Sequence, residues 1–182
     1  MTLVTAQDIL HFWFEELDPK QWFRRDDALD RQIHDRFATT HAAASRCELY
    51  AWRETPTGRL AEIIVLDQFS RNLYREEPRA FAQDALALAL SQEAIFQNVD
   101  QTLSASQKAF LYMPFMHSES AVIHEMALKL FDQPGLENNL DFEIQHKAII
   151  DQFGRYPHRN AMLGRPSTEA ELAFLQNPGA GF

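Results

Sequence analysis

Apolar residues recur every three or four positions along almost the whole chain, and this period constrains the fold more than any other feature. It is clear at residues 9–14 and 29–37, and residues that start helices, such as Thr5, Asp26 and Ser104, precede the apolar runs. No segment shows sustained alternation of apolar and polar residues. The pattern predicts an all-α fold of about eight or nine helices with short connections, arranged as a bundle or as an array of helical hairpins.

Proline, glycine and capping residues place the later helices. We expect helices from about residue 58 to Asn72, from Pro78 to about Asn98, from Ser104 or Ser106 to an interruption at Pro114, from Ser118 or Ser120 to Phe131, from about Leu140 to Phe153, and a short one that begins at Thr168.

Length and charge narrow the class of protein. Residues 1–182 have the size of one domain. The formal net charge of −9 disfavours nucleic acid and membrane surfaces as partners, since both are bound through clustered Lys and Arg. The apolar runs are far shorter than the ~20 residues of a membrane-spanning helix. Cys47 is the only cysteine and no secretory signal is apparent, so we expect a cytoplasmic protein, of unknown oligomeric state.

The segment LDQFSRN, residues 66–72, places charge on an apolar helix. On a helical wheel at about 100° per residue, Asp67 and Arg71 continue the apolar stripe that includes Leu60. A charged pair within such a helix requires partners, because an unpaired buried charge is costly. Asp67 and Arg71 are therefore either a structural ion pair or, with Asn72, the floor of a pocket at the helix end.

The segment FGRYPHRN, residues 153–160, gathers the polar side chains of Arg155, His158, Arg159 and Asn160 at one turn. Guanidinium groups match carboxylate and phosphate geometry, so this density favours binding of an anionic group. The alternative is that the arginines cap helix C-termini, whose carbonyl groups attract cations.

His117 and Glu119 lie just before an expected helix. His117 could carry a proton near neutral pH, with Glu119 orienting it or acting alone. The alternative is a hydrogen-bonded structural histidine. Ser118 and Ser120 are interpreted as helix caps rather than nucleophiles, because no Gly-x-Ser-x-Gly motif surrounds them.

The motifs of common cofactor sites are missing from the sequence. His124-Glu125 lacks the second histidine of a His-Glu-x-x-His zinc helix. A di-iron helical bundle uses two Glu-x-x-His pairs, whereas Glu143-x-x-His146 is the only one here. No Gly-rich phosphate loop occurs. We therefore expect no metal and no cofactor.

Aromatic residues cluster near the start of the chain, at residues 12–14 and 22–23, with Trp52 further on. At helical spacing such residues are usually core, and this is the preferred interpretation. A tryptophan-lined groove for a ligand or peptide is the alternative.

One short sequence occurs twice. IVLDQFSR at residues 64–71 and AIIDQFGR at residues 148–155 are offset by 84 positions (148 − 64). Helical repeats of about 34–40 residues would accommodate two units in that distance. Asp151 falls opposite the apolar stripe of its helix, however, so the echo need not place Asp67 and Asp151 in equivalent environments.

Six segments carry a resemblance to a known family: residues 10–14, 22–23, 66–72, 113–119, 153–160 and 163–165. Together they resemble the bacterial proteins described as domain of unknown function 924, whose fold is described as TPR-like. The resemblance implies stacked helical hairpins, in agreement with the internal echo. It carries no established activity, so it assigns no catalytic residue.

Two functions follow as hypotheses. The first is a helical-hairpin protein that binds a small phosphate- or carboxylate-bearing ligand in a pocket lined by Arg and His; the second is a TPR-like protein- or peptide-interaction module without catalysis. The ligand-binding candidates are Asp67, Arg71, Asn72, His117, Glu119, Arg155, His158, Arg159 and Asn160. If these groups only stabilise the fold, each should be paired internally and no cavity should remain.

Overall fold

The computed structural model describes residues 3–177 and 179. Its α-helices are α1 (Ala6–His11), α2 (Asp27–Ser45), α3 (Pro56–Ile64), α4 (Ser70–Leu73), α5 (Asp84–Phe96), α6 (Ala105–Met116), α7 (Ala121–Phe131), α8 (Glu137–Phe153) and α9 (Glu169–Leu175). Short 3-10 turns lie at Pro19–Gln21, Tyr50–Glu54, Pro78–Phe81, Val99–Thr102 and Pro157–Arg159. The residues that the structure describes contain no strand, so the all-α prediction is confirmed.

Side-chain caps start the helices where the sequence predicts. Thr5 and Thr168 each accept the N–H of the residue three positions later, in reciprocal capping boxes that begin α1 and α9. Asp26 accepts two backbone N–H groups at the start of α2. α8 ends at Gly154, whose φ of 68° is readily adopted only by glycine.

The prediction that Pro114 interrupts its helix was wrong. α6 continues through Pro114 to Met116. A proline in the last turn removes one helical hydrogen bond, but the side chains of residues 109–116 are all buried. Burial of this apolar turn offsets the lost bond.

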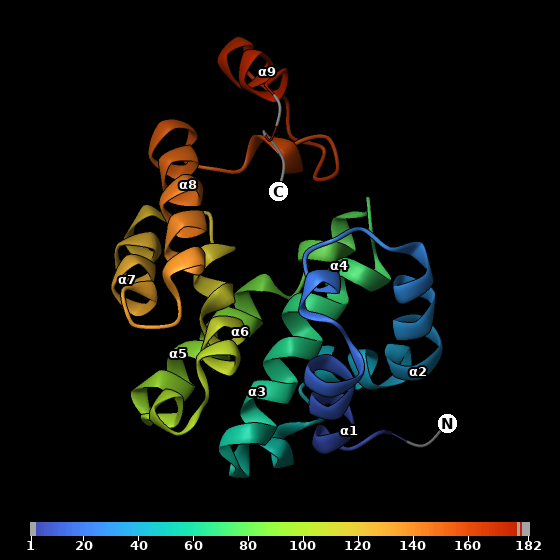
Figure 1. Cartoon of the computed structure of the whole chain (residues 1–182). Helices are drawn as coiled ribbons and strands as arrows, with labels where there is room; N and C mark the ends of the chain where they lie inside the picture. The colour runs from blue at the N-terminus through green and yellow to red at the C-terminus, as the bar shows by residue number, and fades with distance from the viewer. Residues whose placement is uncertain (1–2, 178, 180–182) are drawn as a thin grey trace.

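The helices pack in two groups around one continuous segment (Figure 1). α1 packs on α3 and α2 on α4, whereas α5 packs on α6, α6 on α7 and α7 on α8. The central segment runs from α3 through a π-helical turn at Val65–Phe69 into α4, and every residue from Leu60 to Ser70 is buried. No helix within residues 3–177 and 179 combines the length and the apolar content needed to cross a bilayer.

The front aromatic residues divide between core and surface. Phe12 and Trp13 are buried, and their rings contact Phe69 at centroid distances of 6.1 and 5.6 Å. Trp22 is only partly buried, and Phe23 is 67% exposed. The core interpretation therefore holds for Phe12 and Trp13 and is wrong for Phe23, because the chain after the Pro19–Gln21 turn leaves the helical pattern.

Candidate ligand-binding site

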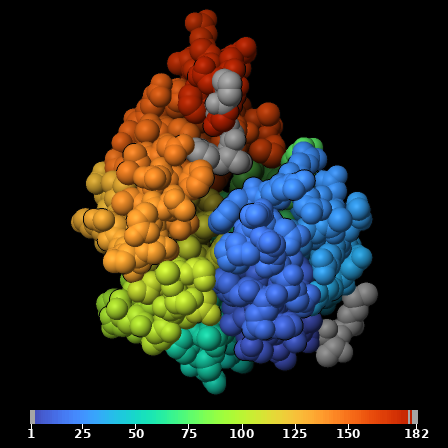
Figure 2. Space-filling model, in the orientation of Figure 1, coloured from blue at the N-terminus to red at the C-terminus, as the bar shows by residue number. Residues whose placement is uncertain are grey.

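A cavity of about 800 Å³ lies where the two helix groups meet. In the space-filling view, the N-terminal part of the chain (blue) and the α8 region (orange) meet along a furrow (Figure 2). The cavity is lined by Trp22, Phe23, Arg24, Arg25, Gln68, Arg71, Asn72, Arg75, Glu76, Ala80, Phe81, Met113, Met116, His117, Asn138, Asn139, Phe142, His146, Tyr156, His158, Arg159 and Met162. A pocket of this size is typical for a small organic molecule.

The charged side chains of this lining are mostly basic. Five arginines reach the wall, against Glu76 as the one acidic side chain among the lining residues. Three histidines, His117, His146 and His158, also line it, and burial lowers the pKa of each. The chain as a whole carries a net charge of −9. The carboxylates that balance the arginines, Asp30, Asp67 and Asp84, stand behind the wall rather than in it. The cavity therefore presents guanidinium donors to whatever enters it.

Asp67 and His117 form the innermost pair of the site. The imidazole Nδ1 of His117 lies 2.7 Å from Oδ1 of Asp67, whose side chain is 1% exposed. Burial alone would raise the pKa of Asp67, but His117 and Arg71 outweigh it and lower that pKa. Burial, followed by the charge of Arg71, lowers the pKa of His117, while Asp67 opposes the change. Near pH 7 the pair is thus a carboxylate and a neutral imidazole that donates through Nδ1.

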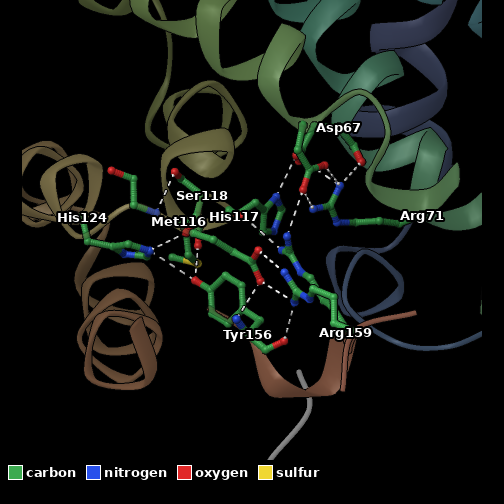
Figure 3. A network of polar contacts seen from close by, with 12 residues as sticks. Asp67, Arg71, Met116, His117, Ser118, His124, Tyr156 and Arg159 are labelled. Atoms are coloured by element: carbon green, nitrogen blue, oxygen red, sulfur yellow. Dashed lines mark hydrogen bonds and ion pairs between the residues drawn. The ribbon is translucent and has the colours of Figure 1, made fainter. Parts of the chain in front are cut away.

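Arg71 and Arg159 extend this pair into a network (Figure 3), and both bind Asp84. Arg71 donates to both oxygens of Asp84 at 3.0 and 3.1 Å and lies 3.3 Å from Oδ1 of Asp67. Arg159 shares Asp84 at 3.2 Å and also donates to the backbone oxygen of His117 at 3.1 Å. Two arginines therefore share one carboxylate. Arg71 also donates to the backbone oxygen of Asp67 at 2.7 Å, whereas Arg159 keeps N–H capacity for another acceptor, including its Nε.

The guanidinium group of Arg159 is held between two rings. It lies 4.6 Å from the ring centroids of both Phe81 and Tyr156. Nε of Arg159 has no hydrogen-bond partner among the described residues, even though only 8% of the side chain is exposed to solvent. Burial and the nearby charge of Arg71 lower the pKa of Arg159. Such an incompletely paired buried cation is one sign of an anion site.

A second network fixes the backbone around His117. The hydroxyl of Tyr156 donates to the carbonyl of Met116 at 2.5 Å, and Nε2 of His124 lies 2.8 Å from the carbonyl of Ser118. Nδ1 of His124 contacts buried Glu143 at 2.6 Å, and burial raises the pKa of that glutamate. The residues on both sides of His117 are therefore anchored, Ser118 to α7 through His124 and Met116 to Tyr156 in the segment after α8.

Six of the nine candidate residues lie together. Asp67, Arg71, His117 and Arg159 form the network, and Asn72 and His158 line the same cavity. The amide of Asn72 donates to Asp30 at 2.8 Å. Burial, followed by the charge of Arg159, lowers the pKa of His158 to about 4.

The other three candidates, Glu119, Arg155 and Asn160, lie outside this lining and hold the C-terminal segment. Glu119 receives two hydrogen bonds from Arg165, at 2.6 and 2.9 Å. Arg155 binds Glu171 at 2.6 and 2.8 Å, and Asn160 donates to Ser167. Within the segment FGRYPHRN, therefore, only Tyr156, His158 and Arg159 line the cavity.

Several residues of the site escaped the sequence analysis. Asp84 has no local signature, since an acid in the first turn of a helix is common. Arg24 and Arg25 stand beside Asp26 and resemble an ordinary helix start. Trp22 and Phe23 could have been found from the sequence, because their cluster of aromatic residues also fits a tryptophan-lined groove.

The described residues contain no group of three or more His, Cys, Asp or Glu side chains placed to hold a metal ion. The acidic groups nearest the cavity are already bound to arginines or, for Asp67, also to His117. What the arrangement offers is hydrogen-bond donors and a neutral imidazole.

Fold and cavity together define an all-α protein with an arginine-lined cleft between two helix groups. The chain belongs to the family described as bacterial protein of unknown function (DUF924), whose model matches residues 9–179. It is similar to the solved structure of a protein of unknown function from Agrobacterium tumefaciens, with 38% sequence identity and a TM-score of 0.90. That match covers 94% of this chain and 96% of the other. No curated protein matches the chain.

Proposed function

We propose that this protein binds a small organic anion, with a carboxylate or phosphate group held by Arg71, Arg159 and His117. The observation that supports this most is the excess of arginine and histidine around an 800 Å³ cavity in a chain of net charge −9. An anion would accept the N–H groups that Asp84 leaves free on the two arginines. Because the cavity is partly shielded from water, such hydrogen bonds are stronger than on an open surface.

The purely structural interpretation of these charges fits less well. It requires complete internal pairing and no cavity. Within the described residues, Nε of Arg159 and Nδ1 of His158 are buried without a hydrogen-bond partner, and both residues line the cavity. Unsatisfied buried polar atoms are few in native proteins, and two of the five among the described residues lie beside this cavity.

A cytoplasmic location and a TPR-like arrangement are part of the same proposal. The first is supported by the single cysteine, Cys47, which can form no internal disulfide. The second is supported by the successive packing of α5, α6, α7 and α8. Such an array would also suit a protein or peptide partner, with an acidic side chain or C-terminus in the cavity.

Calorimetric titration of the protein with acetate, benzoate, inorganic phosphate and neutral benzamide tests the anion site. We expect at least one anion to bind, and benzoate to bind more tightly than benzamide. The variant Arg159→Lys keeps the charge but loses the planar fork, so affinity should fall by about tenfold, the effect of one charge-assisted hydrogen bond.

Arg79→Gln is the matched control, because Arg79 is an exposed arginine whose side chain is paired with Glu77 and does not line the cavity. Its affinity should equal that of the parent protein. Circular dichroism establishes that each variant is folded, and His117→Gln provides a second cavity variant if Arg159→Lys does not fold. Equal binding of benzoate and benzamide, or no binding of any anion, would contradict the proposal.

Anion binding should take up a fraction of a proton. The imidazole of His117 is neutral in the empty site, because burial and Arg71 lower its pKa against the opposing charges of Asp67 and Asp84. A bound anion favours the imidazolium and raises that pKa, so affinity should increase as the pH falls, by at most about tenfold per unit. Titration with benzoate in two buffers of different ionisation enthalpy measures the uptake, which His117→Gln should abolish.

A further inference from the structure

One part of the cavity wall is apolar and remains uncovered. Phe23 is 67% exposed and Phe142 is 51% exposed, and both line the cavity. Large apolar side chains scattered singly on a surface need no explanation, but two that border one cavity form a surface from which a ligand could displace water.

The Trp22–Phe23 part of this wall packs against the core. The ring of Phe23 stacks on Phe110 at a centroid distance of 6.0 Å, and Trp22 meets Phe110 edge-on at 5.0 Å. The indole N–H of Trp22 donates to the carbonyl of Trp13 at 2.8 Å, which ties the wall to the core. Packing already holds Trp22 and Phe23 in place without a ligand, so these two side chains should lose little conformational entropy on binding.

The apolar wall and the arginine network belong to one continuous space. Gln68 connects them, because its amide donates to Asp67 at 2.5 Å and contacts the sulfur of Met113 at 3.3 Å. Met113, Met116 and Met162 also line the cavity. Methionine side chains adapt to apolar groups of different shapes.

We propose that the ligand is an amphipathic carboxylate, with its charged group at Arg71 and Arg159 and an apolar acyl or aromatic body against Trp22, Phe23 and Phe142. This inference rests on the proposed anion site and specifies its ligand class. Acetate or phosphate alone would leave most of the 800 Å³ empty, whereas a body of several carbons would fill it and cover the two exposed rings.

Calorimetric titration with acetate, hexanoate and octanoate tests the class, with 1-octanol as the uncharged counterpart of octanoate. Affinity should increase by roughly fourfold for each methylene group that is buried. Octanoate should bind at least tenfold more tightly than 1-octanol, because only octanoate has a carboxylate for the arginines.

Phe23→Ser and Phe142→Ser should each weaken octanoate binding several-fold and leave acetate binding unchanged. Phe96→Ser is the matched control, since Phe96 is 83% exposed on α5 and does not line the cavity. All three replacements concern exposed side chains, so the fold should persist.

The outcomes separate this inference from the anion site itself. If acetate and octanoate bind with equal affinity, the amphipathic ligand is wrong and the anion site stands. If 1-octanol binds as tightly as octanoate, the carboxylate makes no contribution and the inference is overturned. If none of the carboxylates binds, the inference fails together with the carboxylate form of the proposed function, and phosphate binding then decides the latter alone.

Discussion

Replacement of Asp67 by alanine should lower the free energy of unfolding by about 3–5 kcal/mol, whereas Asp151→Ala should change it by no more than about 0.5 kcal/mol. The two aspartates stand in nearly identical sequences. Asp67 is buried between His117, Gln68 and Arg71, so its removal leaves donors with a missing acceptor. The side chain of Asp151 is 50% exposed and paired with Lys147 on the surface.

Equilibrium unfolding in urea measures both variants. Asp67→Asn keeps the volume and one acceptor oxygen, so it should be less destabilising than Asp67→Ala. If Asp67→Ala lowers the free energy of unfolding by less than about 1 kcal/mol, the network contributes little to stability. Some buried ion pairs behave in this way, because the cost of removing the charges from water offsets their attraction.

The protein should lose stability as the pH falls from 6.5 to 4, and His41 should account for about 2 kcal/mol of that loss by pH 5. Nε2 of His41 lies 2.7 Å from the hydroxyl of Ser70, which itself donates to the carbonyl of Leu66. His41 must then be the donor to Ser70. Its Nδ1 is buried without a partner in the described part of the chain, and burial lowers its pKa to about 4.

The direction of this pH dependence follows from the number of protons bound to His41 in the folded and unfolded states. Between pH 6.5 and 4 the unfolded chain carries a proton on this imidazole and the folded protein does not, so acid favours unfolding; above pH 6.5 the term is constant. Urea unfolding at a series of pH values measures the slope. His41→Gln should reduce the slope in this window by up to about 1.4 kcal/mol per pH unit, and exposed His34→Gln should not. Equal slopes in all three proteins would refute the assignment.

The burial of Asp67 could be predicted from the sequence, although for a broader reason than the helical wheel. The segment from Leu60 to Phe69 is apolar on nearly all sides of its helix, which predicts a central helix. The structure buries every residue from Leu60 to Ser70, so any charged residue there is enclosed. The wheel itself assumes 100° per residue, and the π-helical turn at Val65–Phe69 departs from that value.

The partners in the network could not be predicted from the sequence. Asp84 binds Arg71 from 13 positions away and Arg159 from 75 positions away, and neither separation corresponds to a helical period. Tertiary packing alone brings them together. Local pattern also does not distinguish Arg155 from Arg159. Gly154 ends α8 in the left-handed conformation, and beyond it Arg155 binds Glu171 whereas Arg159 binds Asp84.

The π-helical turn makes the site depend on chain length as well as on residue identity. A π turn contains one residue more than an α-helical turn. A chain one residue shorter within Val65–Phe69 could still form an unbroken buried helix, but Arg71 and Asn72 would be rotated by about 100° relative to α3. The guanidinium group would then no longer point toward Asp84. The extra residue of the π-helical turn therefore orients Arg71, at the end of this helix, toward the cavity.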